Sequence, residues 1–345
     1  MDGKIVNDVK LKYKVAKKNF SKIMADVQSK CVHTVISKGV LYNVLPYENE
    51  LYGYKVKGKK IDEPICKNNC YRYSFDEQGH IILVEEMSEF LGHFHYVTMY
   101  FYHEDRIETM YWAADTLYNV TVYLLGEQGP TEVYFCSDES EAYREYYYEN
   151  ACLMKIVSQI KQDTTEIGIN FSFFYKPNGI LQKIIRSWDS GGTEVVYTTD
   201  KINYKKLEQR LLNEMEEAVL DFTEQNEDKK ITVMGFICYP GHGYLSLSAD
   251  TGDCVNGASP AYWEYEDFAS SSLVDIPLDD KEEEKVLDTV AKAADAVTKL
   301  SVFSKLSKAD GFYCTMFNHD EEYIEETNPK LKKLLRDNPY FSHST

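Results

Sequence analysis

The sequence predicts an α+β fold in two domains. Residues 1–200 are expected to form an antiparallel meander of tandem β-hairpins preceded by a helix, and residues 201–345 a separate α+β domain. In the first domain, apolar residues recur with period two and glycine-containing turns are evenly spaced. After residue 200, helical and strand-like patterns follow one another. Tyrosine is abundant, with 28 copies in 345 residues, which suits sheets with one half-exposed face.

The chain opens with a pattern close to helical spacing over residues 4–30. Lysines fill the positions between the apolar residues, so we expect one amphipathic helix with a basic outer face. Its apolar positions are Val9, Tyr13, Ala16, Phe20, Ile23 and Val27.

Five hairpins of about 25 residues each are expected between residues 71 and 186. Three have glycine turns, at Gly79, Gly129 and Gly179, which lie 50 residues apart. Each glycine is expected to take a left-handed conformation, which avoids a Cβ clash. Two further hairpins are expected to turn near Glu104-Asp105 and Asn150. Because each hairpin buries its face against its neighbours, the repeat predicts one long meander.

The second domain is expected to have the order helix, strand, strand, helix, strand, helix. The first helix carries one apolar stripe, and two strands, KITVMGFICY and GYLSLSA, follow it. Asp280 and Glu283 have the spacing of a capping box at the start of the second long helix. The apolar stripes are Leu207, Leu211, Met215, Ala218 and Phe222 in the first helix, and Val286, Val290, Ala293, Val297 and Leu300 in the second.

Composition and charge limit the classes of function. The net charge of −18 repels phosphates, so nucleic-acid binding is disfavoured, whereas a basic protein partner would be attracted. Acidity that serves solubility alone is the alternative. The first residues lack a secretory signal and no apolar stretch is long enough to span a membrane, so we expect a cytoplasmic protein without membrane contact. Most of the eight cysteines are expected to be buried free thiols.

Three short motifs raise chemical possibilities, each with a simpler explanation. Asp250-Thr251-Gly252 matches the core of aspartic proteases but occurs once, and it is also an ordinary loop sequence. Pro240-Gly241-His242-Gly243 is explained by a turn between two strands. No phosphate-binding loop is present. We therefore assign no catalytic residue and no cofactor.

A group of histidines and cysteines near residue 90 could ligate zinc. A hairpin sheet also places polar side chains on its wet face without any metal, so no metal site is assigned and the question stays open. The group consists of Cys66, Cys70, His80, His93, His95 and His103.

One segment is a candidate partner interface, because aromatic anchors rimmed by acids suit protein interfaces. We expect it to lie in a loop before a helix. The alternative is that Trp263 fills the domain core. The segment's candidate residues are Tyr262, Trp263, Glu264, Tyr265, Glu266 and Asp267.

The order of features over residues 204–335 resembles a known family. An opening helix (EMEEAVLDF) leads to a strand ending in tyrosine (VMGFICY), the SPAYWEYEDF segment, a long helix, Asp310-Gly311-Phe312, and Thr327-Asn328-Pro329 before a last helix. This order resembles the bacterial domain of unknown function family 4303, although Trp263 alone represents the family's ladder of tryptophans. That family resembles immunity-type proteins encoded beside toxins, which implies a protein partner and no enzymatic activity. The first-domain repeats resemble YwqK-like or YD-type hairpin arrays in architecture only.

Three functional hypotheses follow. The first is a non-catalytic cytosolic binding protein of immunity or antitoxin type, which neutralises a basic toxin domain by occlusion. The second is an assembly scaffold whose sheet edges pair with other chains, with the opening helix as a cap on the array. The third is a metal-dependent hydrolase that uses the histidines or Asp250.

Overall fold

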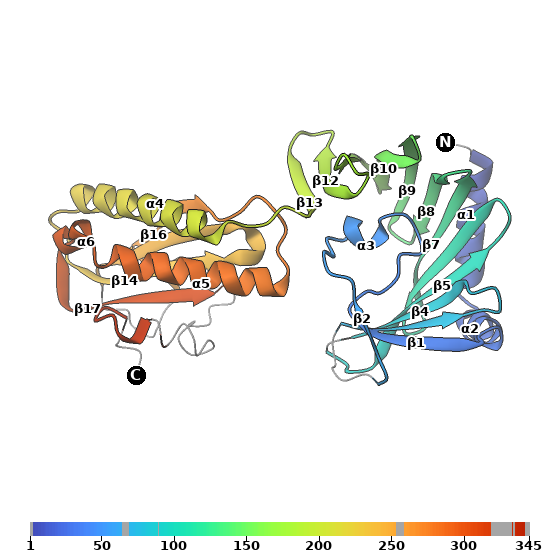
Figure 1. The fold of residues 1–345 in the computed structure, drawn as a ribbon, viewed down its shortest axis with the longest axis horizontal. Coiled ribbons are helices and arrows are strands. Elements are labelled where there is room, and N and C mark those ends of the chain that lie inside the picture. Colours follow the sequence, from blue (N-terminus) through green and yellow to red (C-terminus); the bar gives the residue numbers. More distant parts are fainter. Residues whose placement is uncertain are drawn as a thin grey trace. The chain divides into compact units, whose positions relative to one another are not determined.

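A computed structural model of the chain describes residues 3–63, 69–88, 90–252, 259–318, 333 and 335–341. The chain divides into two compact units, Met1–Thr199 and Asp200–Thr345. The first contains a large antiparallel sheet and the second a small mixed sheet covered by helices (Figure 1). The chain thus combines α and β elements with a predominance of strands.

The sheet of the first unit has 13 strands in the order β13-β12-β11-β10-β9-β8-β7-β6-β5-β4-β3-β1-β2. From β3 onward each strand pairs with the next one in the sequence, which confirms the antiparallel meander. The strands are β1 (His33–Lys38), β2 (Lys59–Ile61), β3 (Cys70–Phe75), β4 (Ile81–Met87), β5 (Phe94–Tyr102), β6 (Arg106–Ala113), β7 (Thr116–Gly126), β8 (Gly129–Ser137), β9 (Ser140–Glu149), β10 (Cys152–Gln162), β11 (Thr165–Tyr175), β12 (Leu181–Trp188) and β13 (Thr193–Thr198).

The hairpin turns follow two geometries. Gly79 and Gly179 have φ of 82° and 78°, which is the left-handed conformation expected from the sequence. Gly129 differs, because it is the first residue of β8, has φ of 133° and pairs with Gly126 across a two-residue turn. The positive φ expected at Gly129 is present, but the expected turn type is wrong, because two residues and not four make the connection. A Cβ there would lie 2.8 Å from the Tyr148 hydroxyl, so close packing is a second reason for glycine.

The opening segment forms two helices, α1 (Gly3–Ala16) and α2 (Phe20–Ser29), instead of the single helix expected. Asn19 separates them, because its side-chain Nδ2 donates to the Val15 carbonyl at 2.7 Å and so occupies an acceptor of the last turn of α1. Both helices pack on one face of the sheet, with α1 against β7 and β8. They do not cap the end of the array, as the scaffold hypothesis had supposed.

The opposite face of this sheet packs against the segment between β1 and β2, which includes the short helix α3 (Glu48–Leu51). Side chains alternate between the two faces, as strand geometry requires. On β6, for example, Met110 and Trp112 face the helices, whereas Thr109 and Tyr111 face the other side. The sheet thus separates one apolar cluster on the side of the helices from two clusters on the side of the loop.

The second unit has the order α4, β14, β15, β16, α5, α6, β17. Its sheet order is β16-β15-β14-β17, with β14 and β17 parallel. The strand β16 was not expected from the sequence. The elements are α4 (Tyr204–Gln225), β14 (Ile231–Tyr239), the short 3-10 helix η1 (Pro240–His242), β15 (Tyr244–Asp250), the 3-10 helix η2 (Pro260–Tyr262), β16 (Tyr265–Ser272), α5 (Asp280–Val297), α6 (Ser301–Lys305) and β17 (Lys308–Asn318).

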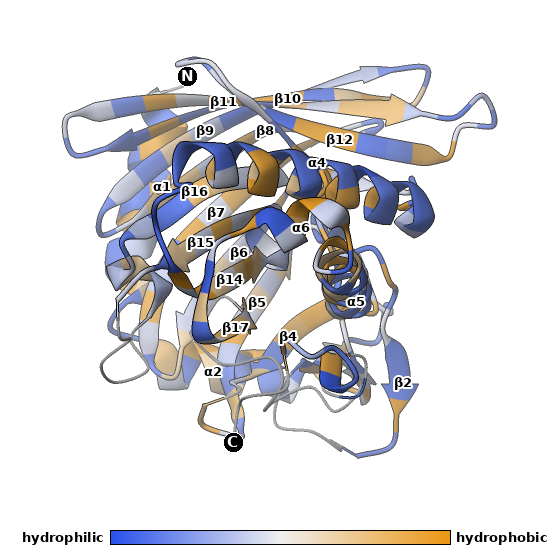
Figure 2. Cartoon of the chain, turned by 90° about the vertical axis from the view of Figure 1, so that its left-hand side faces the viewer, coloured by the Kyte–Doolittle hydropathy of each residue, from blue (hydrophilic) through white to orange (hydrophobic). Residues whose placement is uncertain are grey.

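Helices α4 and α5 bury the apolar stripes against the sheet. In α4 the stripe includes Val219 in place of the expected Ala218, which is only partly buried. The capping box is formed by Asp279 and Glu282, one residue earlier than expected, because Asp279 is the residue with extended backbone before the helix. Much of the α4 ribbon has the colour of hydrophilic residues, with short hydrophobic segments between them (Figure 2). No helix in the described ranges is long and apolar enough to cross a membrane.

Candidate functional site

The acidic and aromatic segment at residues 262–267 does not form a loop. It joins the end of η2 to the edge strand β16, whose Leu247↔Ala269 and Ala249↔Tyr265 pairings with β15 draw it into the sheet. The expectation of a loop before a helix is therefore wrong. The strand was missed because ASSS has low strand propensity and its pairing with β15 is not a tight hairpin.

Trp263 lies in the core of the second unit, with 6% of its surface exposed. It packs with Val233, Ile237 and Phe317 on one side of the sheet. A Cβ on Gly235 would lie 2.7 Å from the indole ring, so glycine at that strand position makes room for it. Trp263 therefore fills the core of the second unit, which was the alternative interpretation of the sequence. Its indole ring offers little surface to a partner.

The other residues of the segment lie at the surface. Tyr262 is 83% exposed, and the Glu264 carboxylate accepts from the Thr251 hydroxyl. Glu266 and Asp267 are exposed at a bulge where Asp267 has φ of 45°. Tyr265 packs edge-on against Phe222 of α4. The segment therefore leads directly to the boundary between β16 and α4.

A groove of about 580 Å³ lies between α4 and β16. Its floor includes Phe222 and Phe268, whose rings stack with centroids 4.3 Å apart. One wall is the outer edge of β16, from Phe268 to Ser272. The other wall is one face of α4, with Arg210, Glu214, Glu217, Asp221 and Gln225 at helical spacing.

The outer edge of β16 presents backbone groups to this groove. The Leu273 N–H donates toward β15, to Gly243 O at 2.7 Å, whereas Ser272 O points outward and accepts from Arg210 Nη2 at 2.6 Å. In an antiparallel strand, the backbone N–H and C=O groups of successive residues point alternately toward the neighbouring strand and away from it. Ser270, two residues before Ser272, therefore also directs its N–H and C=O outward. Within the described ranges, no further strand pairs with this edge.

The groove wall on α4 is acidic. Arg210 is paired with Glu214 at 3.1 Å and with the end of β16. Glu217 and Asp221 are exposed and form no ion pair with another described residue. Glu214, Glu217 and Asp221 were not among the candidate residues predicted from the sequence. The signal was present, because acids at 214, 217 and 221 share a helix face that lies directly beside the apolar stripe.

The Asp250-Thr251-Gly252 triplet is built into the sheet end near this site. Asp250 Oδ1 accepts from the Glu264 backbone N–H at 3.2 Å, and Thr232 Oγ1 donates to Gly252 O at 2.8 Å. These contacts tie the β15 end to the start of β16. The triplet is thus part of the support for the edge strand.

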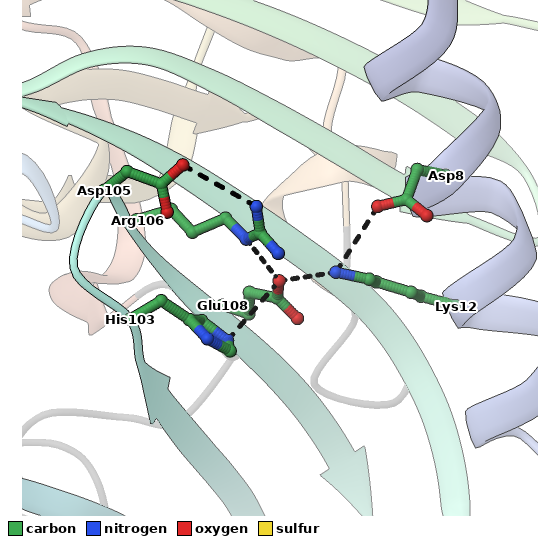
Figure 3. Close-up of polar contacts among 6 residues, drawn as sticks. All are labelled: Asp8, Lys12, His103, Asp105, Arg106 and Glu108. Carbon is green, nitrogen blue, oxygen red and sulfur yellow. Dashed lines mark hydrogen bonds and ion pairs between the residues drawn. The ribbon is translucent and has the colours of Figure 1, made fainter.

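The histidines do not form one cluster. His80 stacks on Tyr102 and contacts Asp76 at 3.3 Å, whereas the rings of His93 and His95 are 5.9 Å apart. His103 lies 3.6 Å from the buried carboxylate of Glu108, in the network that Figure 3 shows. These four histidines therefore have different partners, and those of His80 come from its own turn and from β5.

No three His, Cys, Asp or Glu side chains in the described part of the chain are grouped so that they could hold a metal ion. Cys70 is buried in β3, and Cys66 lies outside the described residues. His242 lies in η1, the turn between β14 and β15. Six described cysteines are free thiols, of which Cys70, Cys136, Cys238 and Cys314 are buried.

The chain was compared with models of known protein families and with curated protein sequences. No family model matches it, and no curated protein matches it significantly.

Proposed function

We propose that the chain is a non-catalytic protein-binding module of immunity type, which binds a basic segment of its partner at the groove between α4 and β16. The observation that carries this proposal is an open strand edge beside an acidic helix face. An extended peptide adds to such an edge through backbone hydrogen bonds, and its side chains then select for the neighbouring surface. Glu217 and Asp221 favour lysine or arginine there.

The distribution of charge supports a basic partner. The unit Asp200–Thr345 contains 29 Asp and Glu against 16 Lys and Arg, a net charge of −13, out of −18 for the whole chain. Such a field speeds the approach of a cationic partner and depends strongly on salt. The resemblance to immunity-type proteins motivates the choice of a toxin domain as that partner.

Self-assembly through the 13-stranded sheet is less well supported. Its two edges are β2, which has three residues including Lys59 and Lys60, and β13, which has six. Short strands and lysines at an edge oppose edge-to-edge pairing. The binding hypothesis therefore ranks above the scaffold hypothesis.

The test is co-expression of the chain with the toxin encoded beside it, read out by growth and by recovery of a stable complex. We expect the chain to restore growth. The double variant Glu217→Lys/Asp221→Lys should weaken the complex at least tenfold, because it reverses the charge of the groove wall.

The matched control is Glu216→Lys/Glu224→Lys, which makes the same charge change on exposed α4 positions outside the groove. It should retain most of the affinity. Equal weakening by the two double variants would show that net charge matters and the groove does not. Absence of both rescue and complex with the unaltered chain would overturn the proposal.

A further inference from the structure

The segment between β1 and β2 forms a closed loop on the sheet face opposite α1 and α2. Its neck is closed where Gly58 N donates to Val40 O at 2.6 Å. Within it, Tyr42 packs edge-on against Tyr73 of β3, and Tyr47 packs against Phe173 of β11. The loop thus spans the face from β3 to β11 and encloses space between itself and the strands.

That space is a cavity of about 420 Å³ walled largely by tyrosines. Tyr73 and Tyr100 are buried at 3% and 6% exposure, whereas Tyr52 and Tyr54 are 78% and 41% exposed and mark the side open to solvent. Ring faces of this kind accept flat apolar groups. The tyrosines that line the cavity are Tyr42, Tyr52, Tyr54, Tyr71, Tyr73, Tyr100, Tyr111 and Tyr123.

Two carboxyl groups in the cavity have partners within the protein. Glu86 accepts from the Tyr71 hydroxyl at 3.2 Å, and Glu48 accepts from Val44 N at 3.3 Å. Burial raises the pKa of both carboxyls above the usual value, against these hydrogen bonds, which lower it. Neither group therefore requires a ligand to be satisfied.

Arg144 of β9 is different. It lines the cavity, yet it forms no ion pair with any described residue, and its buried Nε has no hydrogen-bond partner. Its guanidinium lies near the Tyr146 hydroxyl, whose pKa burial raises and Arg144 lowers. A guanidinium that lines a tyrosine-walled space and forms no ion pair with the described carboxylates is a site for an anion, because its fork of donors matches carboxylate geometry.

We propose that this cavity binds a small aromatic carboxylate, with the carboxylate on Arg144 and the ring among the tyrosines. Shape and charge agree in this assignment, since pockets of this size hold small organic molecules through apolar walls and a few placed polar groups. The site lies wholly within the first unit and is independent of the groove on α4.

The test uses the full chain and two probes, naphthalene-2-carboxylate and its uncharged analogue naphthalene-2-carboxamide, titrated by calorimetry. We expect the carboxylate to bind at least tenfold more tightly than the amide, because a charge-assisted hydrogen bond is lost with the amide. In Arg144→Met this preference should disappear. Arg186→Met, whose native side chain pairs with Glu194 outside the cavity, should keep it.

If Arg144→Met does not fold, Arg144→Lys keeps the charge but loses the planar fork, and it should reduce the preference severalfold. Three results would overturn the proposal. They are no binding of the carboxylate at millimolar concentration, equal affinity for the two probes, or an unchanged preference in the folded Arg144 variant.

Discussion

The backbone N–H of Gly58 donates to the carbonyl of Val40 at 2.6 Å, which closes the loop that forms one wall of the tyrosine cavity. The approach is so close that a Cβ on Gly58 would lie 2.1 Å from Gly39 O. The obstacle is backbone, which cannot rotate away as a side chain can. Glycine at this position is therefore a condition for the closed loop.

We predict that Gly58→Ala destabilises the first unit by about 1–3 kcal/mol, because the loop neck must widen. Urea denaturation followed by far-UV circular dichroism measures the change. Gly3→Ala is the control, since no described residue outside its own helix lies within 4 Å of a Cβ at that position. Equal stability of Gly58→Ala and the unaltered chain would contradict the close backbone contact between Gly58 and residues 39–40.

The second prediction concerns Gly235 and Trp263. A Cβ at Gly235 would lie 2.7 Å from the indole, so Gly235→Ala should destabilise the second unit by about 1–3 kcal/mol. In a Trp263→Leu background the same change should cost less, because the smaller side chain leaves room. A double-mutant cycle on unfolding free energies measures this, with an expected coupling of about 0.5–3 kcal/mol. Simple additivity would show that the two residues do not compete for space.

The third prediction concerns the buried carboxylate of Glu108 (Figure 3). Burial alone would raise the pKa of Glu108, but hydrogen bonds from Lys12 Nζ at 2.5 Å and Arg106 Nε at 2.7 Å outweigh burial and hold that pKa below its usual range. A carboxyl whose pKa is lowered by folding stabilises the folded state above the unfolded pKa. That stabilisation is lost as the pH falls through the folded pKa.

Glu108→Gln should therefore lower the unfolding free energy by about 1–3 kcal/mol at pH 7. The difference from the unaltered chain should shrink below about pH 4.5. Denaturation at a series of pH values from 7 to 3 measures it, with Glu127→Gln, which is exposed in the β7–β8 turn, as the control. If the difference in unfolding free energy grew toward acid pH, the pKa of Glu108 would be raised by folding and not lowered, and the prediction would be wrong.

The parts of the fold that could be predicted are those encoded locally. The hairpins from β3 to β12 follow from alternation and turn residues, and Gly79 and Gly179 have the conformations their turns require. The Gly129 turn was mispredicted because Gly126 pairs with it across two residues, which glycine spacing alone does not reveal. The break at Asn19 depends on one side-chain hydrogen bond inside an otherwise helical pattern.

The two sites could be predicted only in part, because each joins residues that are distant in sequence. The groove needs α4 beside β16, and β16 is a serine-rich strand recognisable only by its pairing with β15. The cavity needs Arg144 of β9 to face tyrosines of β3 to β7 under the loop that contains Glu48. The abundance of tyrosine indicated that one face of the sheet is half exposed. It did not indicate that the segment between β1 and β2 covers that face.

Hydrogen exchange of β16, measured with and without the bound toxin partner, tests whether the partner adds a strand at this edge. If the partner adds a strand at this edge, the outward amide of Ser270 should exchange at least tenfold more slowly in the complex, because it gains a backbone acceptor. The amide of Ser271, which points toward β15, serves as the internal reference. A stable complex that leaves the exchange of Ser270 unchanged would contradict the account.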